Sequence, residues 1–276
     1  MKRILSITLT LVLLLGLCCS VAFAADEDVS VLVTIANKDG KLVLVQEEIA
    51  VKDIDSDGQL TINDALYCAH EAKFDGGAAA GYLSEMTEYG LSLKKLWGTD
   101  NGTGYGYYVN NTGAMSLSDK VFDGSSIVAF IYTDTTNWSD TFSYFDKDSV
   151  TMKAGTDITL TLKSVGFDAS YNTVISPVAN ANITLNGKAV DTKTDADGKV
   201  TLKFAEAGTY VVSASSDSMT LVPPACVITV DAAEVVEPPI SGDAPKTGDT
   251  AALAILALVA VGALGIIVVV KKNREA

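Results

Sequence analysis

Apolar and polar residues alternate along much of the chain and define its predicted elements. Apolar side chains occupy every second position from Val29 to Ile35, a spacing that predicts a largely buried strand. The pair Asp39-Gly40 predicts a hairpin turn, with a returning strand over residues 42–45. Residues 60–74 instead repeat their apolar positions at helical spacing, which predicts the main helix. A further strand is expected over residues 126–133.

The second half of the chain contains only strand and turn patterns. Apolar residues alternate with polar ones over residues 158–162, 200–204 and 210–214. Asn186-Gly187 is a strong signal for a type I′ hairpin, and residues 227–230 predict a closing strand. Several short strands separated by regular turns predict an all-β sandwich over residues 148–231.

The N-terminus has the three parts of a secretory signal peptide. A basic start, Met1-Lys2-Arg3, precedes an apolar run over residues 4–17 and small residues up to Ala24. This order predicts a signal peptide over residues 1–24 with cleavage after Ala24. A lipoprotein site at Cys18 is disfavoured because the bulky Leu17 precedes it.

A second uncharged apolar run occupies residues 251–270. It is long enough to span a hydrocarbon core of about 30 Å, so we expect a C-terminal transmembrane helix. Basic residues follow at once in the tail over residues 271–276. Because basic residues stay on the cytoplasmic side, the body of the protein is predicted to lie outside the cell.

Immediately before this run, residues 244–249 read A-P-K-T-G-D. The segment resembles the sortase cell-wall sorting signal L-P-x-T-G, with Ala244 in place of leucine. The resemblance implies that a sortase recognises Pro245, cuts between Thr247 and Gly248, and joins the chain to peptidoglycan on a Gram-positive bacterium. The chain would then be held in the membrane only before processing. The alternative is a plain single-span membrane protein.

The charge of the chain restricts its partners. The formal net charge is −14, and such a surface repels nucleic acid and anionic lipid while favouring divalent cations. The length between the two processing points is enough for two compact domains. We place them at residues 25–147 and 148–231, followed by a proline-rich stalk with the sorting signal at 232–250.

Residues 53–64 form the most specific motif of the body, D-I-D-S-D-G-Q-L-T-I-N-D. The motif resembles the calcium loop of EF-hand modules, and more closely that of dockerins, because its last position is aspartate. Calcium takes about six to eight oxygen ligands from such a loop. The resemblance implies a Ca²⁺ site formed by Asp53, Asp55, Asp57, Gln59, Thr61 and Asp64.

The alternative to a calcium site at residues 53–64 is an acidic turn that only caps the following helix. The stretch Asp195-Ala196-Asp197-Gly198 serves as an internal comparison. It repeats the middle of the motif, but its first and last ligand positions would be Lys193 and Phe204, so it is predicted to be a hairpin turn.

A glycine-rich aromatic segment follows the predicted helix. Its pattern G-Y-G-Y-Y-V-N, followed by a D-G turn and a strand, resembles the β-grasp module of the transcobalamin C-terminal type over about residues 27–134. The resemblance implies binding of an unidentified extracellular ligand, such as an organic cofactor, a glycan or a protein. Aromatic side chains on such turns stack on sugars or flat rings. The ligand-binding set would be Trp97, Tyr105, Tyr107, Tyr108 and Asn110, and the alternative is that these are core and strand-edge residues.

Residues 192–214 resemble the later hairpins of bacterial immunoglobulin-like surface domains. The expected fold is therefore an α+β, β-grasp-like N-terminal domain, then an all-β immunoglobulin-like sandwich, then a C-terminal transmembrane helix. After export only Cys68 and Cys226 remain, and both are expected to be free thiols. The single histidine, His70, is predicted to lie on the surface of the helix.

The sequence contains no nucleophile elbow, paired-carboxylate motif, zinc motif or phosphate loop. It therefore favours a non-catalytic surface protein that is calcium-stabilised, wall-anchored and binds a ligand or mediates adhesion. One alternative is a scaffold module that recruits secreted enzymes through the calcium loop. Another is a glycan-active enzyme that uses aspartate and glutamate from the acidic face.

Overall fold

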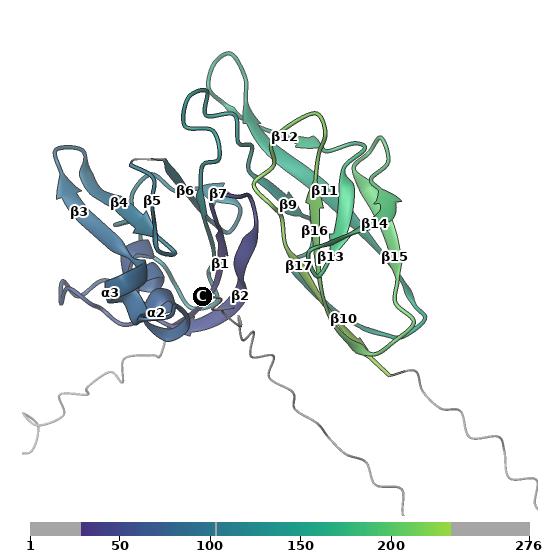
Figure 1. Ribbon diagram of the computed structural model, residues 1–276, viewed down its shortest axis with the longest axis horizontal. Coiled ribbons are helices and arrows are strands. Elements are labelled where there is room, and N and C mark those ends of the chain that lie inside the picture. The colour runs from purple at the N-terminus through teal and green to yellow at the C-terminus, as the bar shows by residue number, and fades with distance from the viewer. Residues whose placement is uncertain (1–28, 103, 233–276) are drawn as a thin grey trace, which may run out of the picture. The chain divides into compact units, whose positions relative to one another are not determined.

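The computed structural model describes residues 29–102 and 104–232 (Figure 1). These residues belong to one compact unit that is mostly β-sheet, with two helices among them. No helix in this part of the chain is both long and apolar enough to cross a membrane. The signal peptide, the sorting signal with Pro245, Thr247 and Gly248, the span at 251–270 and the tail at 271–276 lie outside the described residues, as does nearly all of the stalk.

The N-terminal half is built on a five-stranded sheet in the order β2-β1-β8-β6-β7. Its strands are β1 (Ser30–Ala36), β2 (Leu42–Ala50), β6 (Tyr105–Val109), β7 (Thr112–Gly113) and β8 (Ser126–Ile131). β1 is antiparallel to β2 and parallel to β8. The chain therefore has to cross over between β2 and β8, and the helices lie in this crossover.

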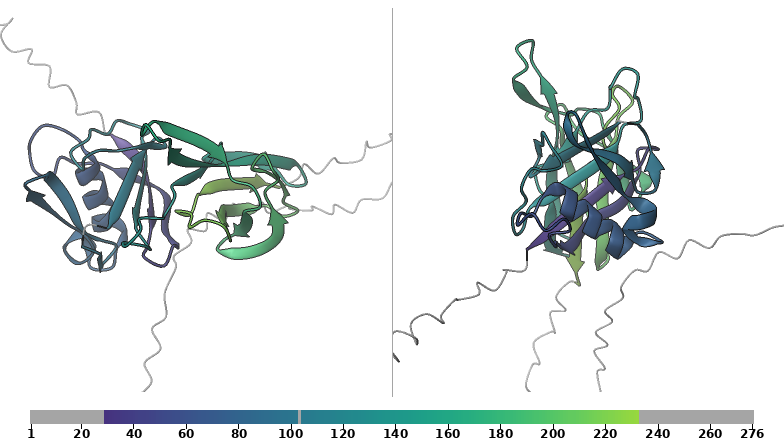
Figure 2. Two further views of the ribbon diagram at one scale, coloured as in Figure 1. Left: turned by 90° about the horizontal axis from the view of Figure 1, so that it is seen from above. Right: turned by 90° about the vertical axis from the view of Figure 1, so that its left-hand side faces the viewer.

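The helices are α2 (Ile62–Lys73) and α3 (Gly77–Gly81). α2 packs on β1 and β2, and both views of Figure 2 show it beside this sheet. A second, three-stranded sheet follows in the order β3-β4-β5, formed by β3 (Leu83–Thr87), β4 (Gly90–Leu96) and β5 (Thr99–Asp100). Val33, Leu66, Leu96 and Ile127 meet in one buried cluster, so helix and sheets share a core.

β2 is longer than the returning strand predicted over residues 42–45. It continues to Ala50 through a shift of register opposite Val33 and Ile35. Gln46 lies in this irregular stretch with a positive φ of 45°. The apolar alternation stops there because β2 is an edge strand, whose polar residues can face solvent.

The C-terminal half consists of two facing sheets. One has the order β10-β17-β16-β13-β14, and the other the order β12-β11-β15, with β9 also paired to β11. The strands are β9 (Ser143–Phe145), β10 (Ser149–Lys153), β11 (Asp157–Phe167), β12 (Thr173–Pro177), β13 (Asn182–Leu185), β14 (Lys188–Lys193), β15 (Lys199–Lys203), β16 (Gly208–Ser215) and β17 (Cys226–Asp231). Leu160 and Leu162 from one sheet meet Ile183, Val212 and Ile228 from the other in one core. This half is therefore a β-sandwich.

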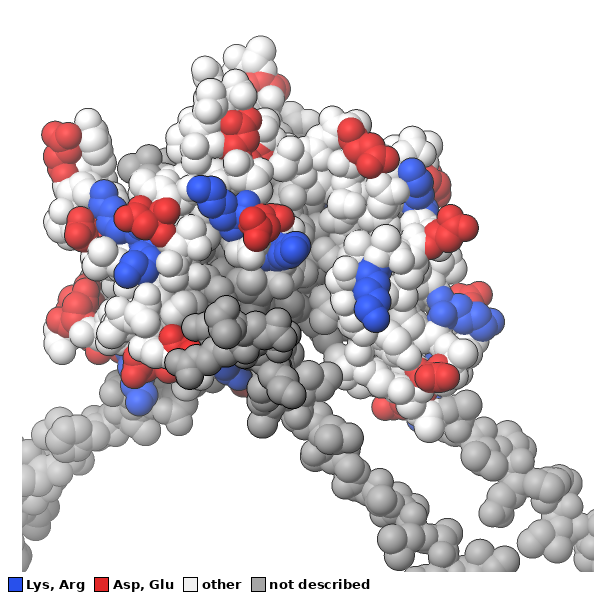
Figure 3. All heavy atoms as spheres, in the orientation of Figure 1, with Lys and Arg blue, Asp and Glu red and all other residues white. Residues whose placement is uncertain are grey.

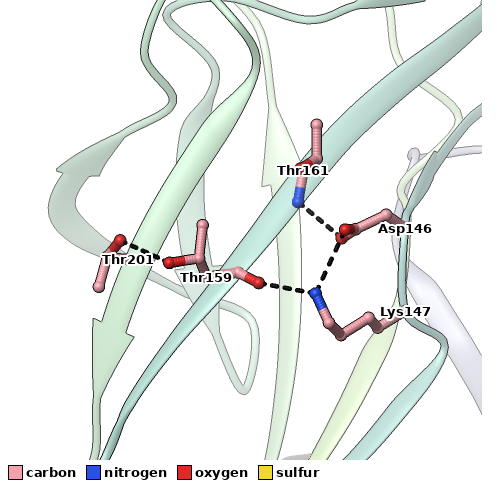
Figure 4. A network of polar contacts seen from close by, with 5 residues as sticks. All are labelled: Asp146, Lys147, Thr159, Thr161 and Thr201. Atoms are coloured by element: carbon pink, nitrogen blue, oxygen red, sulfur yellow. Dashed lines mark hydrogen bonds and ion pairs between the residues drawn. The ribbon is translucent and has the colours of Figure 1, made fainter.

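A polar network fixes the start of the sandwich (Figure 4). Asp146 accepts a hydrogen bond from the Thr161 amide at 2.7 Å. The Lys147 ammonium group donates to the Thr159 carbonyl at 2.9 Å and lies 3.2 Å from Asp146. The Thr159 and Thr201 hydroxyls are 2.9 Å apart. The residues that lead into β10 are thus attached to β11, and β11 to β15.

A third apolar cluster joins residues from the two halves. Phe130 of β8 packs with Phe142, Val165 and Val222. Tyr108 stacks on Phe142 with ring centroids 3.6 Å apart and an interplanar angle of 5°. The boundary predicted at residues 147–148 therefore lies beside a shared core.

Candidate functional site

The loop before α2 brings three carboxylates together. Oxygens of Asp53, Asp55 and Asp57 lie within 4.8 Å of one another. Asp53 accepts backbone hydrogen bonds from Ser56 at 2.7 Å, Asp57 at 3.2 Å and Gly58 at 2.8 Å. Gly58 has a φ of 78°, which glycine adopts at little cost. The chain therefore turns around the first aspartate of the motif.

The last residues of the motif form the helix cap. Thr61 is the N-cap of α2 and makes a capping box with Asp64. Oδ2 of Asp64 accepts from the Thr61 amide at 2.8 Å and from its hydroxyl at 2.6 Å. Oδ1 of Asp64 accepts from the Ile54 amide at 3.0 Å. The buried Asp64 carboxylate is thus engaged by protein donors and lies outside the three-aspartate group.

The two explanations considered for the acidic motif therefore describe different residues. Thr61 and Asp64 cap the helix, as the alternative proposes. Asp53, Asp55 and Asp57 gather on the exposed side of the loop. Gln59 is the remaining predicted ligand. Its backbone amide donates to Asp57 at 2.8 Å, so it would bind a cation through a carbonyl oxygen.

The charges of the loop suit a cation. The hydrogen bond from the Gly58 backbone amide contributes most to lowering the pKa of Asp53. The pKa of Asp55 is raised, first by desolvation and then by the neighbouring charges of Asp57 and Asp64. Carboxylate oxygens are the ligands that Ca²⁺ prefers, so the three aspartates fit part of a calcium coordination shell. The remaining oxygen ligands of the ion would have to come from carbonyl groups or water.

The comparison turn at residues 195–198 is arranged differently. Asp195 accepts from the amides of Asp197 and Lys199 at 2.9 and 2.8 Å. Lys199 lies 3.5 Å from the Asp197 carboxylate, so a lysine already neutralises part of this charge. Within the described residues, these aspartates belong to no group of three possible metal ligands.

The aromatic segment packs into the protein. Tyr105 is buried, and its hydroxyl donates to the Lys94 carbonyl at 2.6 Å. Trp97 is half-buried, with its ring 5.2 Å from that of Phe74 and 5.1 Å from that of His70. It occupies the turn between β4 and β5 with a φ of 48°. Tyr105 is therefore not available for stacking on a ligand, and Trp97 is partly covered by the two neighbouring rings.

The other members of this set also have structural partners. Tyr107 is half-buried on the N-terminal core, and Tyr108 is covered on one face by Phe142. Asn110 is exposed, and its side-chain oxygen accepts from the Ser126 amide at 2.9 Å. The structure does not gather these residues into one exposed aromatic platform. Their packing favours the alternative that they are core and strand-edge residues.

His70 is not on the helix surface, so that prediction is wrong. The residue is 0% exposed. Its Nδ1 lies 2.6 Å from the Leu66 carbonyl, and its Nε2 accepts from the Trp97 amide at 2.9 Å. Desolvation lowers the pKa of His70 to about 4, so the ring is neutral. The Trp97 amide, which comes from the turn between β4 and β5, is thus the hydrogen-bond donor to the buried Nε2.

Both thiols of the described residues are free, with Cys226 buried and Cys68 half-buried. Burial raises the pKa of Cys226 to about 12, so it stays protonated. Cys68 lines a groove of about 340 Å³ with Ile54, Tyr67, Ala50 and Glu71. The sequence analysis missed this groove between β2 and α2. The apolar Ile54 inside an acidic loop was its only signal.

Charged residues of both signs are interspersed over the face seen in Figure 3. The excess of acidic residues in the chain therefore does not form a single acidic patch on this face. This distribution suits solubility and does not indicate a polyanion-binding surface.

No family model matches the chain, and no curated protein matches it. The N-terminal four immunoglobulin domains of Dscam1 isoform 4.44 are 13% identical, with 76% of this chain and 45% of that chain covered and a TM-score of 0.23. A structure reported for Dscam isoform specificity is 12% identical over 55% of this chain and 42% of that chain, with a TM-score of 0.23. This chain thus spans less than half the length of these structures, and the TM-scores are too low to support an argument about fold or function.

Proposed function

We propose that this protein is a non-catalytic, calcium-stabilised binding or adhesion protein, exported and anchored to the wall of a Gram-positive cell. The observation that best supports it is the group of Asp53, Asp55 and Asp57 directly before the longer helix of the described residues. Sortase and peptidoglycan would be its partners during anchoring, and an unidentified extracellular glycan, cofactor or protein its ligand.

The topology supports a β-grasp-like domain for the N-terminal half. A hairpin, β1–β2, leads into α2, and β1 pairs in parallel with the later β8. The two facing sheets of the C-terminal half support an immunoglobulin-like spacer. The aromatic segment is left out of the proposed binding surface, because Tyr105 and Trp97 are packed against other residues.

A bound Ca²⁺ would offset the repulsion between the aspartates of the loop. This chain's own hydrogen bonds link the loop to the helix, because Asp64 accepts from Ile54 and from the N-cap Thr61. A loop held in place by these bonds orders the start of α2. Calcium is therefore proposed to stabilise the N-terminal half through its helix.

Calcium is expected to raise the melting temperature of the protein, and Asp57→Ala is expected to abolish this shift. A ligand at tenfold excess over its dissociation constant stabilises the folded state by about 1.4 kcal/mol. Extracellular calcium modules bind at about 0.1–1 mM, so the comparison needs several millimolar calcium against chelator. Thermal melting of both proteins provides the measurement.

The matched control is Asp197→Ala in the comparison turn, where Lys199 lies beside the carboxylate. This variant should keep the full calcium shift. Identical melting of the unaltered protein in calcium and in chelator would show that the acidic loop only caps the helix and does not bind calcium.

Gly248→Ala is expected to block transfer to the wall, since the resemblance places the scissile bond between Thr247 and Gly248. The variant should then accumulate in the membrane fraction, while the unaltered chain is released with the wall after digestion of peptidoglycan. Equal wall incorporation of the two chains would contradict sortase anchoring and leave a simple membrane span.

A further inference from the structure

Strand β12 is an unusually open edge. It pairs with β11, and no other described strand pairs with it. All five residues of β12 are exposed. Figure 1 shows the β11–β12 hairpin extending beyond the other strands of its sheet. The outer backbone groups of this strand are therefore accessible to another chain.

The pairing register identifies those backbone groups. Val165 lies opposite Ile175, and the Val165 amide donates to Phe142, on the side of β11 away from β12, at 2.9 Å. Val165 and Ile175 therefore form a pair without mutual hydrogen bonds. Because such pairs alternate with bonded ones, the N–H and C=O groups of Ile175 and Thr173 point outward from the sheet.

The other long edge strands of the described residues carry charges, which disfavour pairing with further strands. Among the edge strands of five or more residues, only β12 has no charged side chain. The charged residues on the other edges are Glu47 and Glu48 on β2, Glu85 on β3, Lys153 on β10, Lys188, Asp191 and Lys193 on β14, and Lys199 and Lys203 on β15.

The side chains of the hairpin add an apolar face to this open backbone. Phe167 is 65% exposed, Ile175 56% and Tyr171 88%. Phe167 and Ile175 share one face, because their cross-strand partners are Thr173 and Val165 and side chains alternate along each strand. Asp168 is the only charged residue between Ser164 and Pro177, and its carboxylate accepts from the amides of Ser170 and Asn172.

We propose that β12 pairs with β12 of a second copy of this chain, antiparallel and centred on Ile175. In this register Ile175 exchanges both backbone hydrogen bonds with Ile175 of the partner subunit. Thr173 donates to Pro177 of the partner subunit, and the reverse contact is equivalent. The pair thus makes about four backbone hydrogen bonds and places the two isoleucines side by side on one apolar face.

The symmetric register about Ile175 and the absence of charged side chains on β12 together favour a second copy as the occupant. A chain with a net charge of −14 repels its own copies over most of its surface. The uncharged β12 edge lets two copies approach without setting like charges against each other. A strongly charged partner would find no complementary side chain on this strand. An interface of one short strand belongs to the small, weak class, so the dimer forms in a concentration-dependent manner.

Sedimentation of the purified full chain over a range of concentrations tests the proposal. The mass per particle should rise from that of one chain toward that of two. Ile175→Lys sets two lysines against each other at the centre of the interface and should raise the dissociation constant at least tenfold. Ala189→Lys adds the same charge to the exposed edge strand β14 and should leave the dissociation constant unchanged. Thermal melting checks that both variants fold.

The outcomes separate the possibilities. Association that is lost in Ile175→Lys and kept in Ala189→Lys supports pairing through β12. A chain that stays monomeric at every concentration overturns the proposal. Association that both variants retain places the contact on another surface and also overturns it.

Discussion

Phe130→Ala is expected to lower the free energy of unfolding by about 3–5 kcal/mol, the range found for truncation of large buried aromatic side chains. Phe130 is 2% exposed and belongs to the cluster that contains residues of both halves. Its ring packs directly against Gly106, where an added Cβ would come within 2.2 Å of the ring. No neighbouring side chain projects from Gly106 to refill the space that the ring leaves. Urea unfolding, followed by tryptophan fluorescence, measures the effect.

The control is Phe122→Ala, which removes the same side chain from a position that is 68% exposed. A surface substitution of this kind stays within about 0.5 kcal/mol. Because Phe130 joins both halves, its loss should also separate the unfolding of the two halves into two transitions. A change below about 1 kcal/mol at residue 130 would show that the shared cluster contributes little to stability.

Acidification is expected to destabilise the protein through His70. In the unfolded chain this residue takes up a proton near pH 6.5, whereas in the folded chain its pKa is lowered to about 4. Between these values the unfolded state binds more protons, so stability is lost as the pH falls. The loss amounts to about 2 kcal/mol by pH 5 and about 3 kcal/mol near pH 4. The main cause is desolvation of the buried ring, and a protonated Nε2 would in addition face the Trp97 amide, a second donor.

Urea unfolding at a series of pH values from 7.5 to 5 measures this loss. His70 is the only histidine, and carboxylates titrate mostly below this window. His70→Gln is the matched control, because its side-chain oxygen can accept from the Trp97 amide without titrating. The variant should be less stable at pH 7.5 and nearly independent of pH down to 5. A variant that keeps the slope of the unaltered protein would assign the pH dependence to other groups.

The local patterns predicted the elements whose apolar spacing is regular, and they missed strands such as β3, β4 and β12. The helix expected over residues 60–74 is observed at Ile62–Lys73, and the strand expected over 126–133 is observed at Ser126–Ile131. These elements follow from periodicities that are complete within a short segment. The capping box was also readable, because Thr61 and Asp64 have its spacing, and it corresponds to the helix-capping turn considered as the alternative to the calcium loop.

The failures concern contacts between distant segments. His70 follows Leu66 by one helical turn and therefore lies on the buried stripe of α2. Its Nδ1 bonds to the Leu66 carbonyl within the helix, but the hydrogen bond to its Nε2 comes from the Trp97 amide, 27 residues away. Tyr108 was included in the ligand-binding set on the glycine-rich aromatic pattern alone, whereas in the structure it stacks on Phe142, which lies outside that segment. No pattern within one segment specifies such partners.

The parallel pairing of β10 and β17 has a mechanical consequence. The chain enters β10 at Ser149, opposite Val227, and leaves β17 at Asp231, opposite Lys153. A pulling force applied through these two points acts along both strands in opposite directions. It therefore loads the hydrogen bonds between the strands together, in shear, and cannot open them one after another as in a hairpin pulled from its open end. The sandwich is thus arranged to bear tension transmitted along the chain.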